Sequence, residues 1–152
     1  MRAMVMAGGF GTRLRPLTCN VPKPMVPMMN RPMLEHIFEL LKRHGFTDIV
    51  VALYFHPEVI TEYFGDGSKW GLRLSYLLPD TDLGTAGCVK RAEDLLGREP
   101  FLVISGDVLT NIDLTRAVRY HQDRHALATL VLSRVENPLA FGVVITQEDG
   151  RI

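Results

Sequence analysis

The run RAMVMA (residues 2–7) leads directly into GGFGTRLRPLT (residues 8–18), and this junction decides the expected fold. A short, continuous apolar run that ends at glycines is typical of a buried parallel strand. The glycines at positions 8, 9 and 11 let the backbone adopt positive φ and approach a ligand with no Cβ in the way. Successive N–H groups of such a loop form an anion-binding concavity. The junction therefore predicts a strand followed by a loop that binds an anion.

The side chains after the glycines favour phosphate as that anion. Thr12 offers a hydroxyl donor, and Arg13 offers a planar fork that matches phosphate oxygens. Two known phosphate motifs do not fit: GxGxxG requires glycine where Leu14 stands, and a P-loop that starts at Gly8 requires glycine at position 13. The sequence thus predicts a third kind of phosphate loop. The alternative is a tight glycine turn that carries solvated arginines.

Strand and helix patterns alternate along most of the chain. Apolar runs predict strands over residues 2–7, 48–53, 72–78, 101–105, 126–133 and 141–146. Helical periodicity and capping residues predict helices over residues 33–44, 57–64, 86–96 and 113–124, with Gly45 as a C-terminal cap and Asp113 as an N-terminal cap. The four prolines within residues 21–32 predict an extended loop. This alternation predicts an α/β fold with a mostly parallel sheet and helices on both faces.

Two further glycine-containing segments follow predicted strands. DLGTAG (residues 82–87) comes after the third strand, and Gly106 and Asp107 follow the strand over residues 101–105. Ligands of open parallel sheets bind beyond the carboxyl ends of the strands. The glycine loop and these two segments should therefore meet at one site.

The composition excludes several classes of protein. Of 152 residues, 47% are hydrophobic and 22% are charged, and 17 Lys and Arg balance 17 Asp and Glu. A net charge near zero gives no general attraction to nucleic acid or to an anionic membrane. No apolar run approaches the roughly 20 residues of a membrane span. Cys19 and Cys88 form no CxxC pair. We expect a cytoplasmic globular domain without nucleic acid or membrane partners.

GGFGTRLRPLT, with PKPM shortly after it, closely resembles the signature of the sugar-1-phosphate nucleotidyltransferases. LGTAG and VISGDVLTNIDL resemble the next two motifs of that family, and EHIFELLKRHG and NPLAFGVV are similar to bacterial mannose-1-phosphate guanylyltransferases. The resemblance covers essentially the whole chain. It implies the three-layer α/β/α, Rossmann-like fold of nucleotide-diphospho-sugar transferases. Residues 1–152 would then be the N-terminal, nucleotide-binding part of a nucleotidyltransferase domain, incomplete at its C-terminus.

The resemblance also implies a role for individual residues. Lys23 should reach the phosphates, Asp107 should hold Mg²⁺, and Gly142 should approach the sugar phosphate. Arg13, Lys23 and Asp107 would be the catalytic residues. The residues implied to bind the nucleotide are Ala7, Gly8, Gly9, Gly11, Thr12, Arg13 and Gly84.

The implied reaction joins a nucleoside triphosphate to a sugar 1-phosphate, with GTP and mannose 1-phosphate as the favoured pair. A phosphate oxygen of the sugar attacks the α-phosphorus, and pyrophosphate leaves. The second pKa of the attacking phosphate is near ~6, so the group is largely dianionic and needs no general base. It needs in-line positioning and charge neutralisation, which Arg13, Lys23 and Mg²⁺ on Asp107 would supply.

Each catalytic candidate has an alternative interpretation from its local sequence. Arg13 could be a solvated surface residue, Lys23 a loop lysine between prolines, and Asp107 the cap of a turn.

Other polar residues are given no role. Asp80 and Asp82 are interpreted as loop residues that favour solubility. His121 and His125 have the i,i+4 spacing of a zinc pair, but without an HExxH motif or a third ligand they predict a solvated helix end.

The chain departs from the family pattern at two points. A glutamate or glutamine usually precedes LGTAG and reads the base, whereas Pro79 aligns there, so the base and the sugar stay open and thymidylyl or uridylyl transfer are alternatives. An EKP segment and a second magnesium aspartate are missing, so residues 1–152 alone should bind nucleotide with little turnover.

Two rival functions remain, a catalytically silent regulatory homologue that binds a nucleotide sugar and a dinucleotide oxidoreductase. Leu14 argues against the oxidoreductase. A homo-oligomer is compatible with the sequence.

Overall fold

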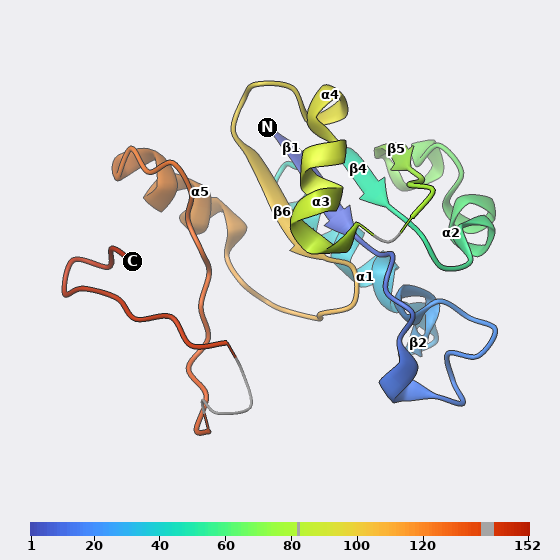
Figure 1. Cartoon of the computed structure of the whole chain (residues 1–152). Helices are drawn as coiled ribbons and strands as arrows, with labels where there is room; N and C mark the ends of the chain where they lie inside the picture. The colour runs from blue at the N-terminus through green and yellow to red at the C-terminus, as the bar shows by residue number, and fades with distance from the viewer. Residues whose placement is uncertain (82, 138–141) are drawn as a thin grey trace. The chain divides into compact units, whose positions relative to one another are not determined.

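The structure, a computed structural model, describes residues 1–81, 83–137 and 142–152. The chain forms two compact units, unit 1 (Met1–Leu114) and unit 2 (Thr115–Ile152). The strands of unit 1 are β1 (Arg2–Met6), β2 (Pro27–Met28), β3 (Arg31–Pro32), β4 (Asp48–Ala52), β5 (Arg73–Leu77) and β6 (Phe101–Ser105) (Figure 1). Its helices are α1 (Met33–Arg43), α2 (Pro57–Phe64), α3 (Gly84–Arg91) and α4 (Glu93–Leu96), with 3-10 turns η1 (Thr12–Leu14), η2 (Lys23–Met25) and η3 (Ser68–Trp70).

Four parallel strands in the order β5-β4-β1-β6 form the central sheet. Their register places the last residues of all four strands in one row across the sheet: Leu77, Ala52, Met6 and Ser105. The chain leaves β1 toward β4 on one side, and β6 lies on the other side of β1. This is the topological switch point at which open α/β sheets bind their ligands. The predicted parallel sheet is confirmed.

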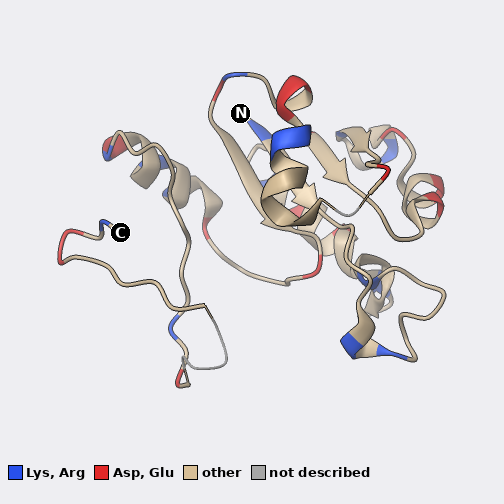
Figure 2. Cartoon of the chain, viewed as in Figure 1, with Lys and Arg blue, Asp and Glu red and all other residues tan. Residues whose placement is uncertain are grey.

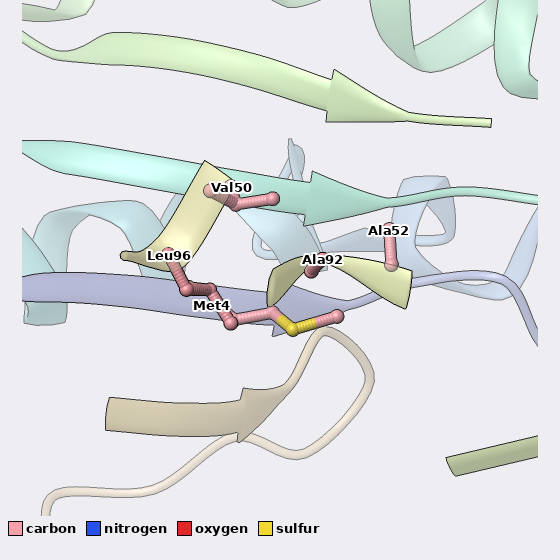
Figure 3. Packing of buried hydrophobic residues seen from close by; sticks show 5 residues of the cluster. All are labelled: Met4, Val50, Ala52, Ala92 and Leu96. Carbon is pink, nitrogen blue, oxygen red and sulfur yellow. The ribbon is translucent and has the colours of Figure 1, made fainter. Parts of the chain in front are cut away.

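The two faces of the sheet carry separate parts of the core. Met4 and Val50 point to the face covered by α3 and α4, where Ala92 and Leu96 pack on them (Figure 3). Alternate residues point to the opposite face, behind which Figure 1 draws α1. The buried residues of α1 are Met33, Leu34, Glu35, Ile37, Phe38, Leu40 and Leu41. Helices therefore cover both faces, as predicted.

The predicted C-terminal cap of α1 is confirmed. Gly45 has φ +82°, its N–H donates to the carbonyl of Lys42 at 3.0 Å, and the N–H of Phe46 donates to the carbonyl of Leu41 at 2.9 Å. These two bonds define a Schellman motif, which satisfies carbonyls that the helix leaves unpaired.

The proline-rich segment over residues 21–32 is not simply an extended loop. Its second half is a hairpin in which β2 and β3 pair antiparallel. Met29 and Asn30, the two residues between the strands, have φ of +51° and +63°. Two consecutive positive φ values make the turn that matches the twist of paired strands. The sequence did not predict this turn, because methionine rarely adopts a positive φ.

The predicted helix over residues 86–96 is two helices. Ala92, at φ −83° and ψ 4°, turns the chain between α3 and α4. Its side chain is fully buried against the sheet, so the turn lets both short helices follow the apolar face. Helix α3 also begins at Gly84, two residues earlier than predicted.

The described residues of unit 2 form neither of the two strands that the apolar runs predict. Helix α5 (Leu114–Asp123) begins at the last residue of unit 1, and no strand follows it in the described residues. Phe141, the first residue of the second predicted strand, lies outside the described residues. The prediction was wrong for residues 126–133 and 142–146, because an apolar pattern forms a strand only where a neighbouring strand completes its backbone hydrogen bonds. In the described part of the chain, no helix is both long and apolar enough to cross a bilayer.

Candidate functional site

A pocket of about 460 Å³ lies at the carboxyl ends of the sheet strands in unit 1. Met6, Ala52 and Ser105, three members of the terminal row, form part of its wall. The ladder continues one residue past the row, since the N–H of Ala7 donates to Ala52 at 2.8 Å and the N–H of Gly106 donates to Met6 at 2.7 Å. The wall of the pocket is therefore held by the sheet itself.

The structure brings together the predicted site residues of unit 1. The predicted residues that line the pocket are Ala7, Gly8, Gly9, Gly11, Thr12, Arg13, Lys23, Gly84 and Asp107. Three segments far apart in sequence thus meet at one site. Gly142 belongs to unit 2, and its approach to a sugar phosphate stays a prediction.

The glycine loop (residues 8–18) needs glycine at position 11 for two reasons. Gly11 has φ +63°, and a Cβ there would lie 3.1 Å from the Cβ of Lys23 and 3.1 Å from the Cγ2 of Thr18. The hydroxyl of Thr18, which is 1% exposed, donates to the carbonyl of Gly11 at 2.7 Å. The N–H of Leu14 donates to the same carbonyl at 2.9 Å and closes η1. This anchoring holds the backbone that carries Thr12 and Arg13.

The other two glycines do not have the positive φ that we expected. A Cβ on Gly8 would lie 3.1 Å from the Cβ of Tyr54, so glycine allows the loop to approach the end of β4 closely. A Cβ on Gly9 would meet nothing within 4 Å. Gly9 therefore leaves open space on its side of the loop, where a ligand can approach the backbone.

Lys23 is placed by the prolines on either side of it. η2 begins at Lys23, the N–H of Met25 donates to the carbonyl of Pro22 at 2.8 Å, and Pro24 is buried. Proline fixes its own φ and restricts the residue before it, so the backbone of Lys23 is held on both sides. The side chain is left to point into the pocket, where its Nζ lies 2.7 Å from Oδ2 of Asp107.

The charged residues among the described lining residues are Arg13, Lys23 and Asp107. Elsewhere on the ribbon, basic and acidic residues are interspersed (Figure 2). The excess positive charge of the pocket is therefore local, as the balanced composition predicted. The first turn of α3 adds Gly84 and Thr85 to the wall, and the amino end of a helix favours an anion. Such a site suits a phosphorylated ligand.

Several lining residues were not singled out by the sequence. Phe10 packs edge-on against Tyr54, with ring centroids 5.6 Å apart, and at 5.4 Å from Phe55. Ser105 ends β6 and Tyr54 follows β4 by two residues, and these positions beyond or at strand ends could have identified them. Thr81 and Cys88 also line the pocket, and neither belongs to a sequence motif that would have predicted this position.

The residues to which we gave no role are not among the described lining residues of the pocket. Asp80 is exposed and is not part of the lining, and Asp82 lies outside the described residues. Helix α5 ends at Asp123, so His121 and His125 do not share a helix. Nδ1 of His121 lies 2.9 Å from the hydroxyl of Thr129. Among the described residues, no three His, Cys, Asp or Glu gather as metal ligands.

Comparisons with known proteins show which family the sequence resembles. The family described as Nucleotidyl transferase matches residues 2–152. A UTP–glucose-1-phosphate uridylyltransferase of Synechocystis is 38% identical over 100% of this chain and 42% of its own length. A mannose-1-phosphate guanylyltransferase of Mycobacterium tuberculosis is 39% identical over 99% of this chain and 42% of its own length. The chain therefore spans less than half of these relatives.

Solved structures share the fold. HddC from Yersinia pseudotuberculosis, complexed with GMP-PN, matches with a TM-score of 0.72 and 27% identity over 80% of this chain and 54% of that protein. A UDP-glucose pyrophosphorylase complexed with UDP-glucose matches with a TM-score of 0.69 and 21% identity over 82% of this chain and 54% of that protein. At that identity, the second match concerns the fold alone.

Proposed function

The chain belongs to the nucleotidyl transferase family, and from this premise we propose that it is the nucleotide-binding part of a sugar-1-phosphate nucleotidyltransferase. The observation that supports the proposal most strongly is the pocket at the switch point of the sheet. There the glycine loop, Arg13, Lys23 and Asp107 line one space. A triphosphate needs this combination of backbone donors and fixed cations.

The proposed reaction is the transfer of a nucleotidyl group to a sugar 1-phosphate. A phosphate oxygen of the sugar attacks the α-phosphorus, the bond between that phosphorus and its bridging oxygen breaks, and pyrophosphate leaves with the electron pair. Arg13 and Lys23 would bind phosphate oxygens, and the wall of the pocket would exclude water. No proton has to be moved, because the attacking phosphate is already largely dianionic.

Asp107 fits a magnesium site of one particular kind. Mg²⁺ is commonly held by one or two carboxylates together with substrate phosphates. Asp107 is the one carboxylate among the described lining residues. It would therefore hold the ion jointly with the nucleotide, and the ion would neutralise charge that develops on the phosphates.

The favoured substrates are GTP and mannose 1-phosphate. They are supported by the similarity to mannose-1-phosphate guanylyltransferases at 39% identity. Uridylyl transfer is the second candidate, because a uridylyltransferase is 38% identical over the whole chain and because Pro79, which lines the pocket, offers no group to read a base edge.

The role of Arg13 can be tested against a neighbour in the same loop. Arg13 lines the pocket and Arg15, two residues on, does not. We expect Arg13→Ala to weaken binding of the preferred triphosphate at least about ten-fold, as the loss of a charge-assisted hydrogen bond implies, and Arg15→Ala to change it less than two-fold. Calorimetry with GTP, UTP, dTTP and ATP in the presence of magnesium measures both the base preference and the loss. Equal effects of the two substitutions would contradict the assignment.

Pyrophosphate release by the whole protein separates an enzyme from a silent homologue. An enzyme releases pyrophosphate when GTP and mannose 1-phosphate are both present, and Arg13→Ala lowers the rate. A protein that binds GDP-mannose but releases no pyrophosphate with any pair of triphosphate and sugar phosphate would instead be a regulatory homologue.

A further inference from the structure

The ion pair between Lys23 and Asp107 occupies the carboxylate that a metal ion would need. Nζ of Lys23 lies 2.7 Å from Oδ2 of Asp107, and the two side chains are 27% and 34% exposed. Both residues line the pocket. Lys23 therefore neutralises Asp107 before any ligand is present.

We propose that Lys23 is a placeholder cation that occupies Asp107 until the phosphate chain of a nucleotide arrives and then transfers to the phosphates, so that divalent metal and nucleotide bind cooperatively. The proposal rests on the proposed function of the same pocket. It adds that one lysine has two successive partners.

The ammonium group and a divalent ion cannot both bind Asp107 at full strength. A magnesium ion binds a carboxylate oxygen at about 2.0–2.1 Å, so it would lie within a few ångströms of the ammonium on the same group. The repulsion between a single and a double positive charge about 4 Å apart lowers metal affinity by at least about ten-fold, even in a medium as polar as water. The described lining residues offer no second carboxylate to offset that repulsion.

A triphosphate removes the competition between Lys23 and the metal ion for Asp107, because its oxygens are further anionic partners for both cations. Its oxygens accept hydrogen bonds from the ammonium and complete the coordination shell of the metal. Lys23 then neutralises phosphate charge, and Asp107 becomes available to the metal. Each ligand therefore improves the site for the other, and this coupling is reciprocal.

The structure allows Lys23 to change partner without moving its backbone. The Cβ of Lys23 lies against Gly11, at the position where a side chain on that glycine would contact it at 3.1 Å. Pro22 and Pro24 hold the main chain on either side. Beyond Cβ, the rest of the side chain is a flexible stem that carries a compact charge. The change of partner is a rotation of that stem between Asp107 and the glycine loop.

The test is a titration of the nucleotide-free full chain with Mn²⁺, in which electron paramagnetic resonance measures the unbound ion. We expect Lys23→Met, which removes the charge and keeps most of the length, to bind Mn²⁺ at least about ten-fold more tightly than the wild type. Lys23→Arg keeps the charge and should bind Mn²⁺ as weakly as the wild type. Adding Asp107→Asn to Lys23→Met should abolish the gain.

Two results would overturn the proposal. One is a Lys23→Met variant that melts at the wild-type temperature and binds Mn²⁺ no more tightly than the wild type. The other is a gain in affinity that persists after Asp107→Asn, because the ion would then lie elsewhere. Lys23→Gln repeats the test with a polar side chain if the methionine variant does not fold.

A second titration adds inorganic tripolyphosphate, which probes the phosphate chain without any base. Tripolyphosphate should increase the Mn²⁺ affinity of the wild type by a larger factor than that of Lys23→Met, because only the wild type has a placeholder to displace. An equal increase in Mn²⁺ affinity in the two proteins would contradict the proposal that Lys23 moves from Asp107 to the phosphates. If no nucleoside triphosphate binds the wild type in calorimetry, the proposed function fails, whereas the nucleotide-free titration still decides whether Lys23 blocks Asp107.

Discussion

At the scale of single residues, Gly11 holds the loop on which the site depends. Its positive φ strains any side chain there, and an added Cβ would lie in tight contact, at 3.1 Å, with both Lys23 and Thr18. Its carbonyl accepts hydrogen bonds from Thr18 and from the N–H of Leu14. One position therefore combines backbone conformation, packing against Lys23 and anchoring of η1.

Gly11→Ala should therefore lose both stability and nucleotide binding. The left-handed backbone alone costs a non-glycine residue about 1–2 kcal/mol, and the close contacts with Lys23 and Thr18 add to this. Gly45 provides the matched control, because it has φ +82° with nothing within 4 Å of an added Cβ. Gly45→Ala should cost only the backbone contribution of about 1–2 kcal/mol in urea denaturation and leave triphosphate affinity unchanged. If both variants bind nucleotide like the wild type, the loop tolerates a side chain at position 11.

At the scale of elements, one carboxylate links three strands at their amino ends. Oδ2 of Asp48, at the start of β4, lies 2.9 Å from Nε of Arg2 on β1 and 2.6 Å from a guanidinium nitrogen of Arg73 on β5. Arg2 also donates to the carbonyl of Leu95 in α4 at 2.6 Å. The hydrogen bond from Arg73, and then that from Arg2, hold the pKa of Asp48 below its usual value despite partial burial.

This lowered pKa has a defined pH dependence. Because the folded protein favours the carboxylate, the stabilisation is fully present above the unfolded pKa of 3.8 and is lost as pH falls through the lower folded value. Asp48→Asn should lower the free energy of unfolding by about 1 kcal/mol or less at pH 7, since both arginines are substantially exposed, and the difference should shrink progressively at acid pH, below 3.8. Glu93→Gln, which removes an exposed pair with Lys90, is the control and should change stability at neither pH. A deficit of Asp48→Asn that persists in acid would refute the ion-pair explanation.

The packing of α4 on the sheet gives a second prediction at this scale. Leu96 is 3% exposed and contacts the cluster around Met4 and Val50, whereas Leu95, the preceding residue, is 37% exposed (Figure 3). Leu96→Ala should cost about 2–4 kcal/mol, because it removes buried surface and leaves a cavity. Leu95→Ala should cost less than about 1 kcal/mol. Chemical denaturation of the two variants measures the difference in the free energy of unfolding. Equal losses would mean that the buried Leu96 stabilises the protein no more than the exposed Leu95 does.

The elements that sequence predicts well are those whose local signals agree with their surroundings. Helix α2 and strand β6 have the predicted bounds, because proline begins one and a continuous apolar run defines the other. The turn at Met29 and Asn30 escaped prediction, since it depends on pairing between β2 and β3. The break at Ala92 depends on the shape of the sheet below it. The wrongly predicted strands of unit 2 show the same limit, because a strand depends on a neighbour that the local sequence does not specify.

At the scale of the whole molecule, unit 1 contains the core and the pocket. Every buried hydrophobic residue among the described residues lies at or before Leu114, and all the residues that line the pocket lie in the same unit. In unit 2, by contrast, Val143 is 65% exposed and Ile145 is 84% exposed. The buried core and the described lining of the pocket therefore both lie within Met1–Leu114.

A chain of residues 1–114 should fold and bind nucleotide by itself. It contains the described four-stranded sheet, both helical layers and the described lining of the pocket, so we expect a cooperative thermal transition and a triphosphate affinity within about two-fold of that of residues 1–152. Circular dichroism and calorimetry on the two chains measure these quantities. If the shorter chain is unfolded, or if it folds and binds no nucleotide, unit 2 contributes to the fold or to the site.

The location of the site was more predictable than its contacts. Strand order and glycine spacing were enough to place Arg13 and Asp107 at one edge, because the ends of parallel strands must coincide. The place of Lys23 came from the family resemblance alone. The pairing of Lys23 with Asp107, and the packing of Phe10 on Tyr54, depend on side-chain geometry across 84 and 44 positions of sequence. No local pattern contains that information.

The uniform direction of the four sheet strands has a practical consequence for protein engineering. Each strand of five residues places its two ends about 13 Å apart, and the pocket lies at only one of them. The turn over residues 97–100, which precedes β6, is exposed at the other end. A short peptide tag inserted there should leave ligand affinity intact, whereas the same insertion after Ser105 should abolish it. Surface immobilisation of the protein for binding assays is therefore best made through the turn over residues 97–100.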